Sequence, residues 1–309
     1  MPGWTDPEWL AEARSWIDAQ LAELGVEPTG ALEQPHVRPW STVLRLPSSA
    51  GDLWFKANHP SLAHEAGVVA LISRRRPDLV PELLAADLER GWMLMGDGGE
   101  RLREVIARER DLSRWLELLP QYAELQIDLA GDADQLVALG SPDRRLAVLP
   151  DRFEELGQSL EHLPRVREWS ARLAAFGIPE TIQHDDFHDG QIFVRDGRYL
   201  FFDWGDACVS HPFCTLSVTL EGVLRWGLDD VEGSVDVTPF RDAYLEPFER
   251  YASRSDLVTA CESAIRLGWV SRALGNHELD VALGTQDQEE EREAVALRLR
   301  LAFRWCQTP

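Results

Sequence analysis

Residues 184–206 carry the side-chain types that kinase-type phosphoryl transfer needs, at spacings that suit it. Asp186 is followed five residues later by the amide Gln191, and Asp203 follows an apolar segment, Tyr199 to Phe202. In this chemistry one carboxylate accepts the proton of the substrate hydroxyl, while an amide oxygen and a second carboxylate hold Mg²⁺. Asp186 is therefore the candidate catalytic base, and Gln191 and Asp203 are the candidate metal ligands.

Two short strands are expected on either side of Arg195-Asp196-Gly197-Arg198, over Ile192 to Val194 and Tyr199 to Phe202. The Asp-Gly pair is a strong signal for a β-hairpin turn. Such a hairpin would bring Gln191 and Asp203 to the same end of the structure, where both could meet one metal ion.

The loop resembles that of the aminoglycoside phosphotransferase family, the small-molecule relatives of protein kinases, which reads roughly His-Gly-Asp-Leu-His-x-Gly-Asn. Here the corresponding stretch begins at His184 and reads His-Asp-Asp-Phe-His-Asp-Gly-Gln. The resemblance places Asp186 at the catalytic aspartate, Gln191 at the asparagine and Asp203 at the second metal ligand. It implies ATP or GTP as the phosphoryl donor and Mg²⁺ as the cofactor, and its motifs cover residues 36–215.

The order of expected elements also indicates an α+β fold, with the active site in a cleft between two lobes. We expect a bilobal protein-kinase-like fold with a small β-rich N-terminal lobe and a larger, mostly helical C-terminal lobe. Residues 1–98 would bind the nucleotide, and residues 99–309 would contain the catalytic loop, the metal site and the acceptor pocket. Periodicity predicts strands near 36–46, 52–58, 82–89 and 91–96, and helices that include 61–75, Arg103 to Leu118, Gln121 to Leu129, 212–226, 256–274 and 286–306.

Lys56 is the single lysine among 31 basic residues. It lies in an apolar strand, Leu53 to Ala57, and its compact ammonium suits nucleotide phosphates in a way that a planar guanidinium does not. In kinase-type enzymes such a strand lysine pairs with the α- and β-phosphates and with a helix glutamate. Glu65 is the candidate partner, because it shares one stripe of the expected helix with Val69 and Ile72.

No Gly-x-Gly-x-x-Gly phosphate loop precedes the strand of the lysine. Ser41 and Thr42, in the expected hairpin before it, are the candidates for capping the phosphates. Further along, Gly91 to Gly99 resembles the family's connector between lobes. The resemblance implies that backbone groups near Met95 and Asp97 meet the adenine.

His184 and His188 are expected to buttress the catalytic loop, although their spacing of four also suits two zinc ligands on a helix. Asp-Asp-Phe-His-Asp-Gly is poor helix material, and no glutamate lies between the histidines. A metal-dependent phosphohydrolase that uses them with Asp185 and Asp186 is one alternative. Another is a catalytically weak kinase-like nucleotide-binding protein, because Gln191 is one methylene longer than asparagine and Mg²⁺ demands near-ideal octahedral geometry.

The net charge of −22 comes from 53 acidic and 31 basic residues. Such acidity disfavours nucleic acid or an anionic membrane as a partner, and it favours a cationic small molecule as the hydroxyl acceptor. Asp206 and Glu221 are the candidates for facing this acceptor. We therefore expect a phosphotransferase that acts on a hydroxyl of an aminoglycoside, another antibiotic or an amino sugar.

Location is indicated by what the sequence lacks. The longest run without charged residues, Ala207 to Leu220, is shorter than the roughly 18 apolar residues that a membrane span needs. The first residues show no basic and apolar leader, and the cysteines at 208, 214, 261 and 306 lack Cys-x-x-Cys spacing. We expect a cytoplasmic protein with reduced thiols.

Overall fold

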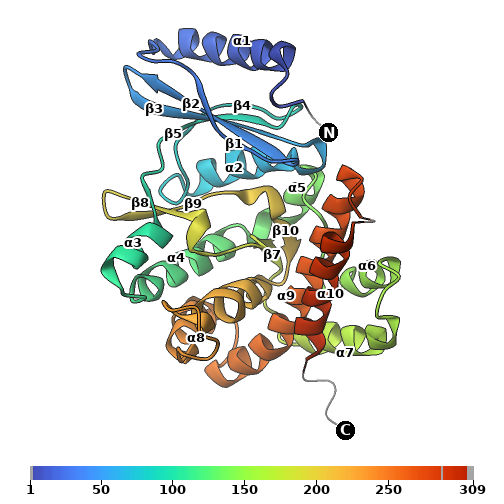
Figure 1. Cartoon of the computed structure of the whole chain (residues 1–309). Coiled ribbons are helices and arrows are strands. Elements are labelled where there is room, and N and C mark those ends of the chain that lie inside the picture. Colours follow the sequence, from blue (N-terminus) through green and yellow to red (C-terminus); the bar gives the residue numbers. More distant parts are fainter. Residues whose placement is uncertain (1–2, 287, 305–309) are drawn as a thin grey trace. The chain divides into compact units, whose positions relative to one another are not determined.

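A computed structural model of the chain describes residues 3–286 and 288–304 (Figure 1). The chain forms two compact units. The N-terminal unit comprises Met1–Glu100 and Phe193–Gly205, and the C-terminal unit comprises Arg101–Ile192 and Asp206–Pro309. The lobe boundary predicted after residue 98 stays a prediction, and the structure adds that the later segment Phe193–Gly205 packs with the N-terminal residues.

The N-terminal unit is built on a five-stranded antiparallel sheet of order β1–β2–β3–β5–β4. Lys56 of β3 pairs with Val43 of β2 and with Met93 of β5. β3 is the central strand, and Lys56 is 3% exposed. The strands are β1 (Glu33–Val37), β2 (Ser41–Ser48), β3 (Gly51–Asn58), β4 (Leu83–Asp87) and β5 (Trp92–Gly96).

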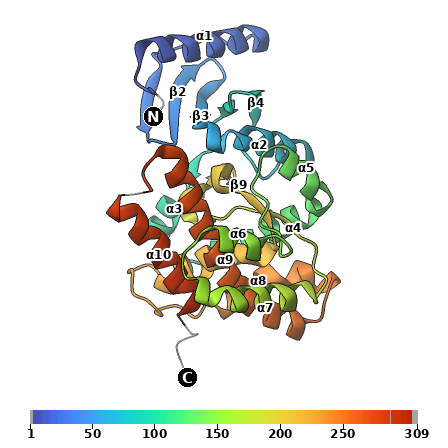
Figure 2. The same cartoon turned by 90° about the vertical axis from the view of Figure 1, so that its right-hand side faces the viewer.

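Two helices cover opposite faces of this sheet, as Figures 1 and 2 show. α1 (Pro7–Leu24) begins after Asp6, whose side chain accepts a hydrogen bond from the Glu8 amide at 2.8 Å, and it ends at Gly25. α2 (His64–Arg75) follows the short helix η1 (Pro60–Leu62) and carries Glu65 in its first turn. The buried face of α1 packs with β2, β3 and β5 in one apolar cluster, which includes Ala13, Ile17, Leu21, Leu44, Phe55 and Leu94.

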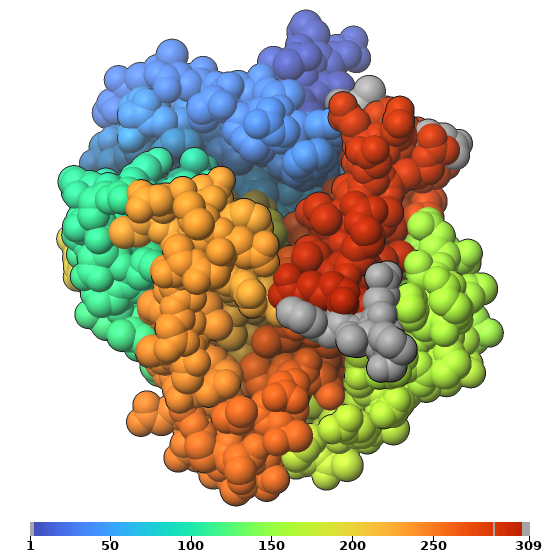
Figure 3. Space-filling model, turned by 60° about the horizontal axis from the view of Figure 1, so that its bottom comes forward, coloured from blue at the N-terminus to red at the C-terminus, as the bar shows by residue number. Residues whose placement is uncertain are grey.

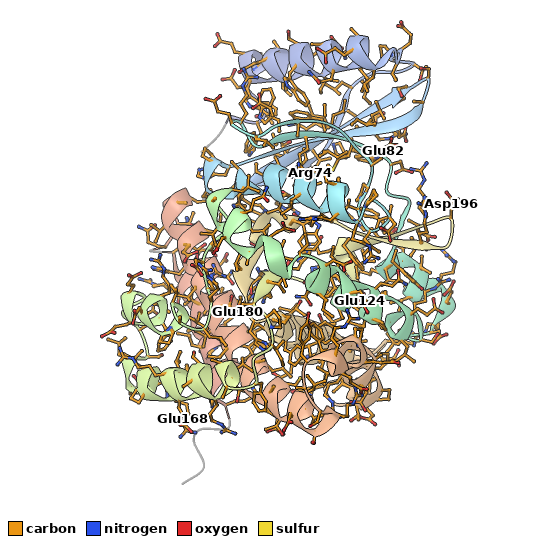
Figure 4. All side chains as sticks on the ribbon, turned by 180° about the vertical axis from the view of Figure 1, so that it is seen from behind. Arg74, Glu82, Glu124, Glu168, Glu180 and Asp196 are labelled. Carbon is orange, nitrogen blue, oxygen red and sulfur yellow. The ribbon has the colours of Figure 1, made fainter. Side chains whose placement is uncertain are left out.

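The predicted hairpin is present as β8 (Ile192–Arg195) and β9 (Arg198–Phe201), which form a sheet of order β6–β8–β9 with β6 (Glu100–Arg101). Figure 4 shows Asp196 at the hairpin tip. Asp196 and Gly197 have φ values of 51° and 76°, as a two-residue hairpin turn requires. The short helix η5 (Trp204–Asp206) follows β9.

The C-terminal unit is mainly helical, and α9 (Arg254–Leu283) packs against α6, α7 and α10 (Figure 2). Figure 3 shows α10, in red, on the surface beside the yellow-green α6–α7 segment. The other helices are α3 (Leu102–Glu109), α4 (Arg114–Asp128), α5 (Ala133–Ala138), α6 (Leu149–Glu155), α7 (Leu163–Ala174), α8 (Thr238–Leu245) and α10 (Glu289–Phe303). Shorter helical segments are η2 (Ala130–Asp132), η3 (Leu160–His162), η4 (Asp189–Gln191), η6 (Pro212–Thr215), η7 (Ser217–Val223), η8 (Leu224–Trp226) and η9 (Glu246–Arg250).

α9 approaches η6 closely at Gly268. A Cβ atom added there would collide with the carbonyl oxygen of Cys214 and would lie 2.6 Å from Ser217 Oγ. Glycine alone fits this crossing, because any side chain would push α9 away from η6. The next turn of α9 carries Arg272.

The helix predicted over Arg103 to Leu118 is wrong, because the chain breaks at Arg110 (φ 55°) into α3 and α4. The predicted break before Gln121 is also wrong, since Pro120 lies inside α4. Proline lacks the N–H that would bond to the carbonyl of Leu116. The helix nevertheless continues to Asp128.

Two further expectations concerned location and thiols. None of the described helices is long and apolar enough to cross a membrane. Cys208, Cys214 and Cys261 are free and buried, and Cys306 lies outside the described residues. Burial raises the pKa of Cys208 to about 12, which keeps this thiol protonated.

Candidate active site

Lys56 lies between two carboxylates in the N-terminal unit. Its Nζ donates to Glu65 Oε1 at 2.8 Å and to Asp203 Oδ1 at 2.5 Å. The lysine and the glutamate are almost completely buried, whereas the Asp203 side chain is 41% exposed. Burial alone would lower the pKa of Lys56, but Asp203 and Glu65 outweigh it and hold the pKa above its ordinary value. Lys56 is therefore charged, and solvent reaches Asp203.

Glu65 is buried and receives three donors. Besides Lys56, Asn58 Nδ2 donates to Oε2 at 2.5 Å and the Trp204 amide donates to Oε1 at 2.9 Å. Burial raises the pKa of Glu65, and Lys56 and Asn58 oppose that shift. A carboxylate is tolerated in such a place only when donors surround it. The glutamate thus holds both the lysine and the backbone next to Asp203.

The loop that carries Asp186 follows β7 (Thr181–Gln183), which pairs with β10 (Cys208–Ser210) in the C-terminal unit. The His184 amide donates to the Tyr122 hydroxyl at 3.0 Å, and the Phe187 carbonyl accepts from Thr219 Oγ1 at 2.8 Å. The Phe187 ring stacks on Tyr122, with ring centroids 4.0 Å apart. These contacts fix the backbone on both sides of Asp186, and they place His184 inside the core.

Asp186 is held through both of its carboxylate oxygens. Arg272 Nη2 of α9 lies 2.9 Å from Oδ1, and Gln191 Nε2 lies 3.5 Å from Oδ2. Burial alone would raise the pKa of Asp186, but Arg272 and His188 outweigh it and hold the pKa well below its ordinary value. The carboxylate is ionised at neutral pH, so it is a hydrogen-bond acceptor for a hydroxyl group.

The His188 ring lies between two carboxylates, with Nε2 3.5 Å from Asp186 Oδ2 and Nδ1 3.7 Å from Asp189 Oδ1. Burial lowers the pKa of His188, whereas the two carboxylates act to raise it. Yet Nδ1 also faces two donors, the Gly190 amide at 2.9 Å and Arg103 Nη2 at 3.2 Å. In a protonated ring Nδ1 would carry a hydrogen that faces these two donors. We therefore assign the neutral Nε2–H tautomer, whose N–H is directed at Asp186.

The residues expected near the nucleotide belong to the N-terminal unit. Thr42 is buried, and its hydroxyl donates to the His36 carbonyl at 2.8 Å within the β1–β2 hairpin. Ser41 is buried at the start of β2. Met95 is buried in β5, and the Asp97 carbonyl accepts a hydrogen bond from Arg195. Their roles toward a nucleotide stay predictions.

Both acids expected to face the acceptor are paired with arginines. Asp206 Oδ2 lies 2.8 Å from Arg272 Nη1. Glu221, in the π-helix η7, accepts from Arg266 at 2.6 Å and from Trp269 Nε1 at 2.8 Å, and Arg304 lies 2.8 Å from it. These guanidinium groups already neutralise the two carboxylates.

A model of the phosphotransferase enzyme family matches residues 18–255. The protein belongs to this family. Membership confirms the predicted relationship and the predicted class of enzyme, a phosphotransferase. No curated protein matches the sequence.

Solved structures of related folds resemble this phosphotransferase along most of its length. A choline/ethanolamine kinase family protein from Mesorhizobium loti has a TM-score of 0.62 and 16% identity, with 91% of this chain and 90% of that chain covered. The GDP and kanamycin complex of APH(2")-IIia has a TM-score of 0.56 and 15% identity, with 95% and 99% covered. The streptomycin–ATP complex of APH(2")-IIa has a TM-score of 0.53 and 15% identity, with 94% and 96% covered. These likenesses confirm the predicted kinase-like α+β fold.

Three residues that pair with the candidate residues were not predicted from the sequence. Asn58 was detectable, because it follows Lys56 by two residues on a strand and so shares its face. Arg272 and Arg144, which pairs with Asp185, gave no local signal among the many arginines. Their positions depend on how α9 and the segment before α6 pack, which periodicity does not reveal.

The candidate metal ligands have the chemistry that Mg²⁺ prefers, a carboxylate and an amide oxygen. Asp203 belongs to the N-terminal unit, where it is accessible to solvent, and Gln191 belongs to the C-terminal unit beside Asp186. The donor types and the exposure of Asp203 fit a hard cation. The zinc interpretation has less support, because the described residues contain no group of three or more His, Cys, Asp or Glu side chains placed to hold a metal ion.

Proposed function

We propose that this phosphotransferase transfers the γ-phosphate of ATP to a hydroxyl group of a small-molecule acceptor. The observation that carries the proposal is the buried Lys56–Glu65 pair with Asp203 against the same ammonium. A buried ion pair adds little net stability, because the cost of desolvating both charges offsets their attraction. Kinase-type enzymes require this pair, and a metal-binding aspartate beside it, to hold the phosphates of the nucleotide.

In the proposed reaction Asp186 accepts a hydrogen bond from the acceptor hydroxyl and directs its oxygen at the γ-phosphorus. The bond from that phosphorus to the bridging oxygen of ADP breaks as the bond to the acceptor oxygen forms. The hydroxyl proton passes to Asp186 and then to solvent. Because the pKa of Asp186 is well below its ordinary value, Asp186 is a weak base and its main contribution is to orient the hydroxyl. The proton would transfer after the bond to phosphorus has largely formed.

The other residues would hold the reactants. Lys56, fixed by Glu65, would contact the α- and β-phosphates. His188 would direct its Nε2–H at Asp186 and so hold the orientation of that carboxylate. Gln191 and Asp203 would hold Mg²⁺, which when bound neutralises the charge on the phosphates. Support for these roles comes from the positions of the residues in the family motif.

We infer ATP as the donor and a hydroxyl of an aminoglycoside, another antibiotic or an amino sugar as the expected acceptor class. The donor inference is supported by the ATP complex among the similar structures, and the GDP complex makes GTP the second nucleotide to test. The acceptor class is supported by the kanamycin, streptomycin and choline/ethanolamine names of those proteins.

An ATP-consumption screen against amino sugars, aminoglycosides, nucleoside antibiotics and choline-like alcohols tests the proposal, with GTP in parallel. We expect acceptor-dependent turnover that Asp186→Asn abolishes. Nucleotide binding without turnover would support the weak kinase-like binding protein instead. Gln191 supports that alternative, because its side chain is one methylene longer than asparagine and its amide nitrogen faces Asp186.

A further inference from the structure

Arg298 lies in α10, which packs along α9, the helix that carries Arg272, and among the described residues it has no acidic partner. Its Nε is buried without a hydrogen-bond partner, and its Nη1 donates at 3.5 Å to the carbonyl of Ala294 in the same helix. Within residues 3–286 and 288–304, no carboxylate lies within ion-pair distance of it. Burial lowers the pKa of Arg298, Arg272 lowers it further, and Asp186 raises it, so the charges of these two residues act on it.

This isolation is unusual for the chain. The protein has 53 acidic residues, and the neighbouring arginines use them: Arg272 bridges Asp186 and Asp206. A half-buried guanidinium without a counter-charge is costly, because it has lost part of its hydration and gained no partner. An anionic group of a ligand would supply what the described residues do not.

The two acids expected to face the acceptor do not favour a polycation. Asp206 and Glu221, the carboxylates expected to bind one, are neutralised by Arg272, Arg266 and Arg304. A cationic acceptor would have to displace these guanidinium groups and would also meet Arg298. The net charge of the whole chain therefore does not describe this part of the C-terminal unit.

A second polar group near Arg272 also has no hydrogen-bond partner in the part of the chain that the structure describes. Asn276 lies one helical turn after Arg272 on the same face of α9, and its Oδ1 is buried without a donor. Its amide can present either the oxygen or the NH₂ group to a ligand. An oxygen-rich acceptor that carries both hydroxyl and anionic groups would satisfy both residues.

We propose that Arg298 forms an anion subsite near Arg272 and Asp186 that receives a carboxylate or phosphate group of the acceptor. The inference rests on the proposed function, because it assumes that the acceptor hydroxyl meets Asp186. The planar guanidinium matches these groups with two parallel hydrogen bonds. This narrows the proposed small-molecule acceptor to a polyhydroxylated acid or a phosphorylated alcohol, and it replaces the aminoglycoside that the net charge of the whole chain favours.

Inorganic phosphate is the first probe of this subsite. Its affinity is measured from the rise in melting temperature of the full chain, for the wild type, Arg298→Gln and Arg300→Gln. Arg300 is an exposed residue of the same helix, so its variant removes the same charge without touching the subsite. We expect Arg298→Gln to weaken phosphate binding by roughly tenfold or more, as the loss of a charged hydrogen bond does. Equal binding by all three proteins, or no binding by any of them, would overturn the proposal.

The anion could also be the terminal phosphate of the nucleotide, so a second arm repeats the titration with saturating Mg²⁺ and a non-hydrolysable ATP analogue. The acceptor subsite predicts that phosphate still binds to the wild type with its affinity unchanged within about twofold. Loss of phosphate binding in the presence of the analogue would assign Arg298 to the nucleotide and overturn the acceptor assignment.

A third arm uses glucuronate, glucose and glucosamine as matched competitors of the phosphate. We expect glucuronate to compete at least about tenfold more strongly than the other two, and to lose this advantage in Arg298→Gln but not in Arg300→Gln. Preferred binding of glucosamine would overturn the inference. This readout needs no turnover, so it can fail while acceptor-dependent ATP consumption stands, and it can succeed where that consumption is absent.

Discussion

Asp185 Oδ2 lies 3.0 Å from Arg144 Nη1, and the two side chains are 1% and 2% exposed. The pair stands directly before Asp186, and Asp185 has a φ of 63°. The resembled family loop, His-Gly-Asp, has glycine at this position, where a left-handed backbone has no steric cost. Aspartate tolerates that conformation, but its buried charge needs a partner, which Arg144 and Gln183 provide.

The first prediction is that Arg144→Met is strongly destabilising and that a second change, Asp185→Gly, restores most of the stability. The single variant leaves a buried carboxylate without its cation, which costs about 3–5 kcal/mol. The double variant removes both charges and gives the loop the glycine of the family. Urea unfolding of the four proteins of this cycle measures the effect. A double variant that is no more stable than Arg144→Met would show that Arg144 acts mainly through other contacts, such as those with Ser271 and Glu278.

A second prediction concerns Asp186→Asn, which should lower turnover by roughly 10²–10⁴-fold while nucleotide affinity stays within a few-fold. The reason is that Asp186 belongs to the loop expected to meet the acceptor hydroxyl, and its other contacts are to Arg272, His188 and Gln191. Steady-state kinetics and nucleotide titration check the two parts. Asp196→Asn is the matched control, because Asp196 is an exposed aspartate at a hairpin tip (Figure 4). Near-wild-type turnover of Asp186→Asn would exclude its proposed role.

Lys56 offers a direct test of where the nucleotide binds. An acyl-phosphate derivative of ATP acylates a lysine near the phosphates, and this chain has one lysine besides its N-terminal amine. We expect labelling of Lys56 that excess ATP and Mg²⁺ prevent, as measured by peptide mass spectrometry. Labelling of the N-terminal amine serves as the internal control, because ATP should not affect it.

The matching variant is Lys56→Arg, which should lose most activity. Arginine keeps the charge, but its larger planar group cannot keep both Glu65 and Asp203 at the distances of the ammonium. If ATP binds by an independent measurement and Lys56 stays unlabelled, the phosphates lie elsewhere.

Gln191→Asn should be tolerated or should raise activity, because it restores the amide of the family motif. The shorter side chain would move the amide away from Asp186, whose Oδ2 now lies 3.5 Å from Gln191 Nε2. The Mg²⁺ dependence of turnover is the measurement, with Asp203→Ala as the variant that should abolish it. A folded but inactive Gln191→Asn would show that the metal site differs from the template.

The parts of this protein that the sequence predicts well depend on local patterns. The hairpin follows from Asp196-Gly197, and the contact of Lys56 with Glu65 follows from a helix stripe one connection after a strand. The contacts of Arg272 with Asp186 and Asp206 do not follow from any spacing, because they require α9 to cross η6 at Gly268. For the same reason the sequence could nominate Asp206 and Glu221 as acids for an acceptor but could not show that arginines neutralise them.

The periodicity of apolar residues also could not predict the type of helix. The predicted helix over 212–226 is helical, but it consists of η6, the π-helix η7 and η8 rather than one α-helix. The helix types differ in their number of residues per turn, but segments of 4, 7 and 3 residues are too short for the spacing of apolar positions to distinguish them. The tertiary contacts of η7 include the donors to Glu221 and the Thr219 hydroxyl that binds the Phe187 carbonyl.

His211 provides the last prediction, which concerns stability at low pH. The ring is completely buried, its Nδ1 accepts the Phe213 amide at 3.2 Å, and burial lowers its pKa to about 3. In the unfolded chain the same ring titrates near its ordinary pKa of 6.5. Between pH 6.5 and about 3 the unfolded state therefore binds the extra proton, so the contribution of His211 to stability is present above pH 6.5 and is lost as the pH falls.

His211→Asn keeps a side-chain acceptor for the Phe213 amide but cannot titrate. The free energies of unfolding of the wild type and this variant should converge by about 2 kcal/mol between pH 7 and pH 5, because each pH unit below 6.5 costs the histidine form about 1.4 kcal/mol. Denaturant unfolding at several pH values measures the difference, and the carboxylates that titrate in both proteins cancel from it. Parallel pH profiles would mean that the buried ring finds a partner for its proton in the folded state, and the assignment of a neutral His211 would then be wrong.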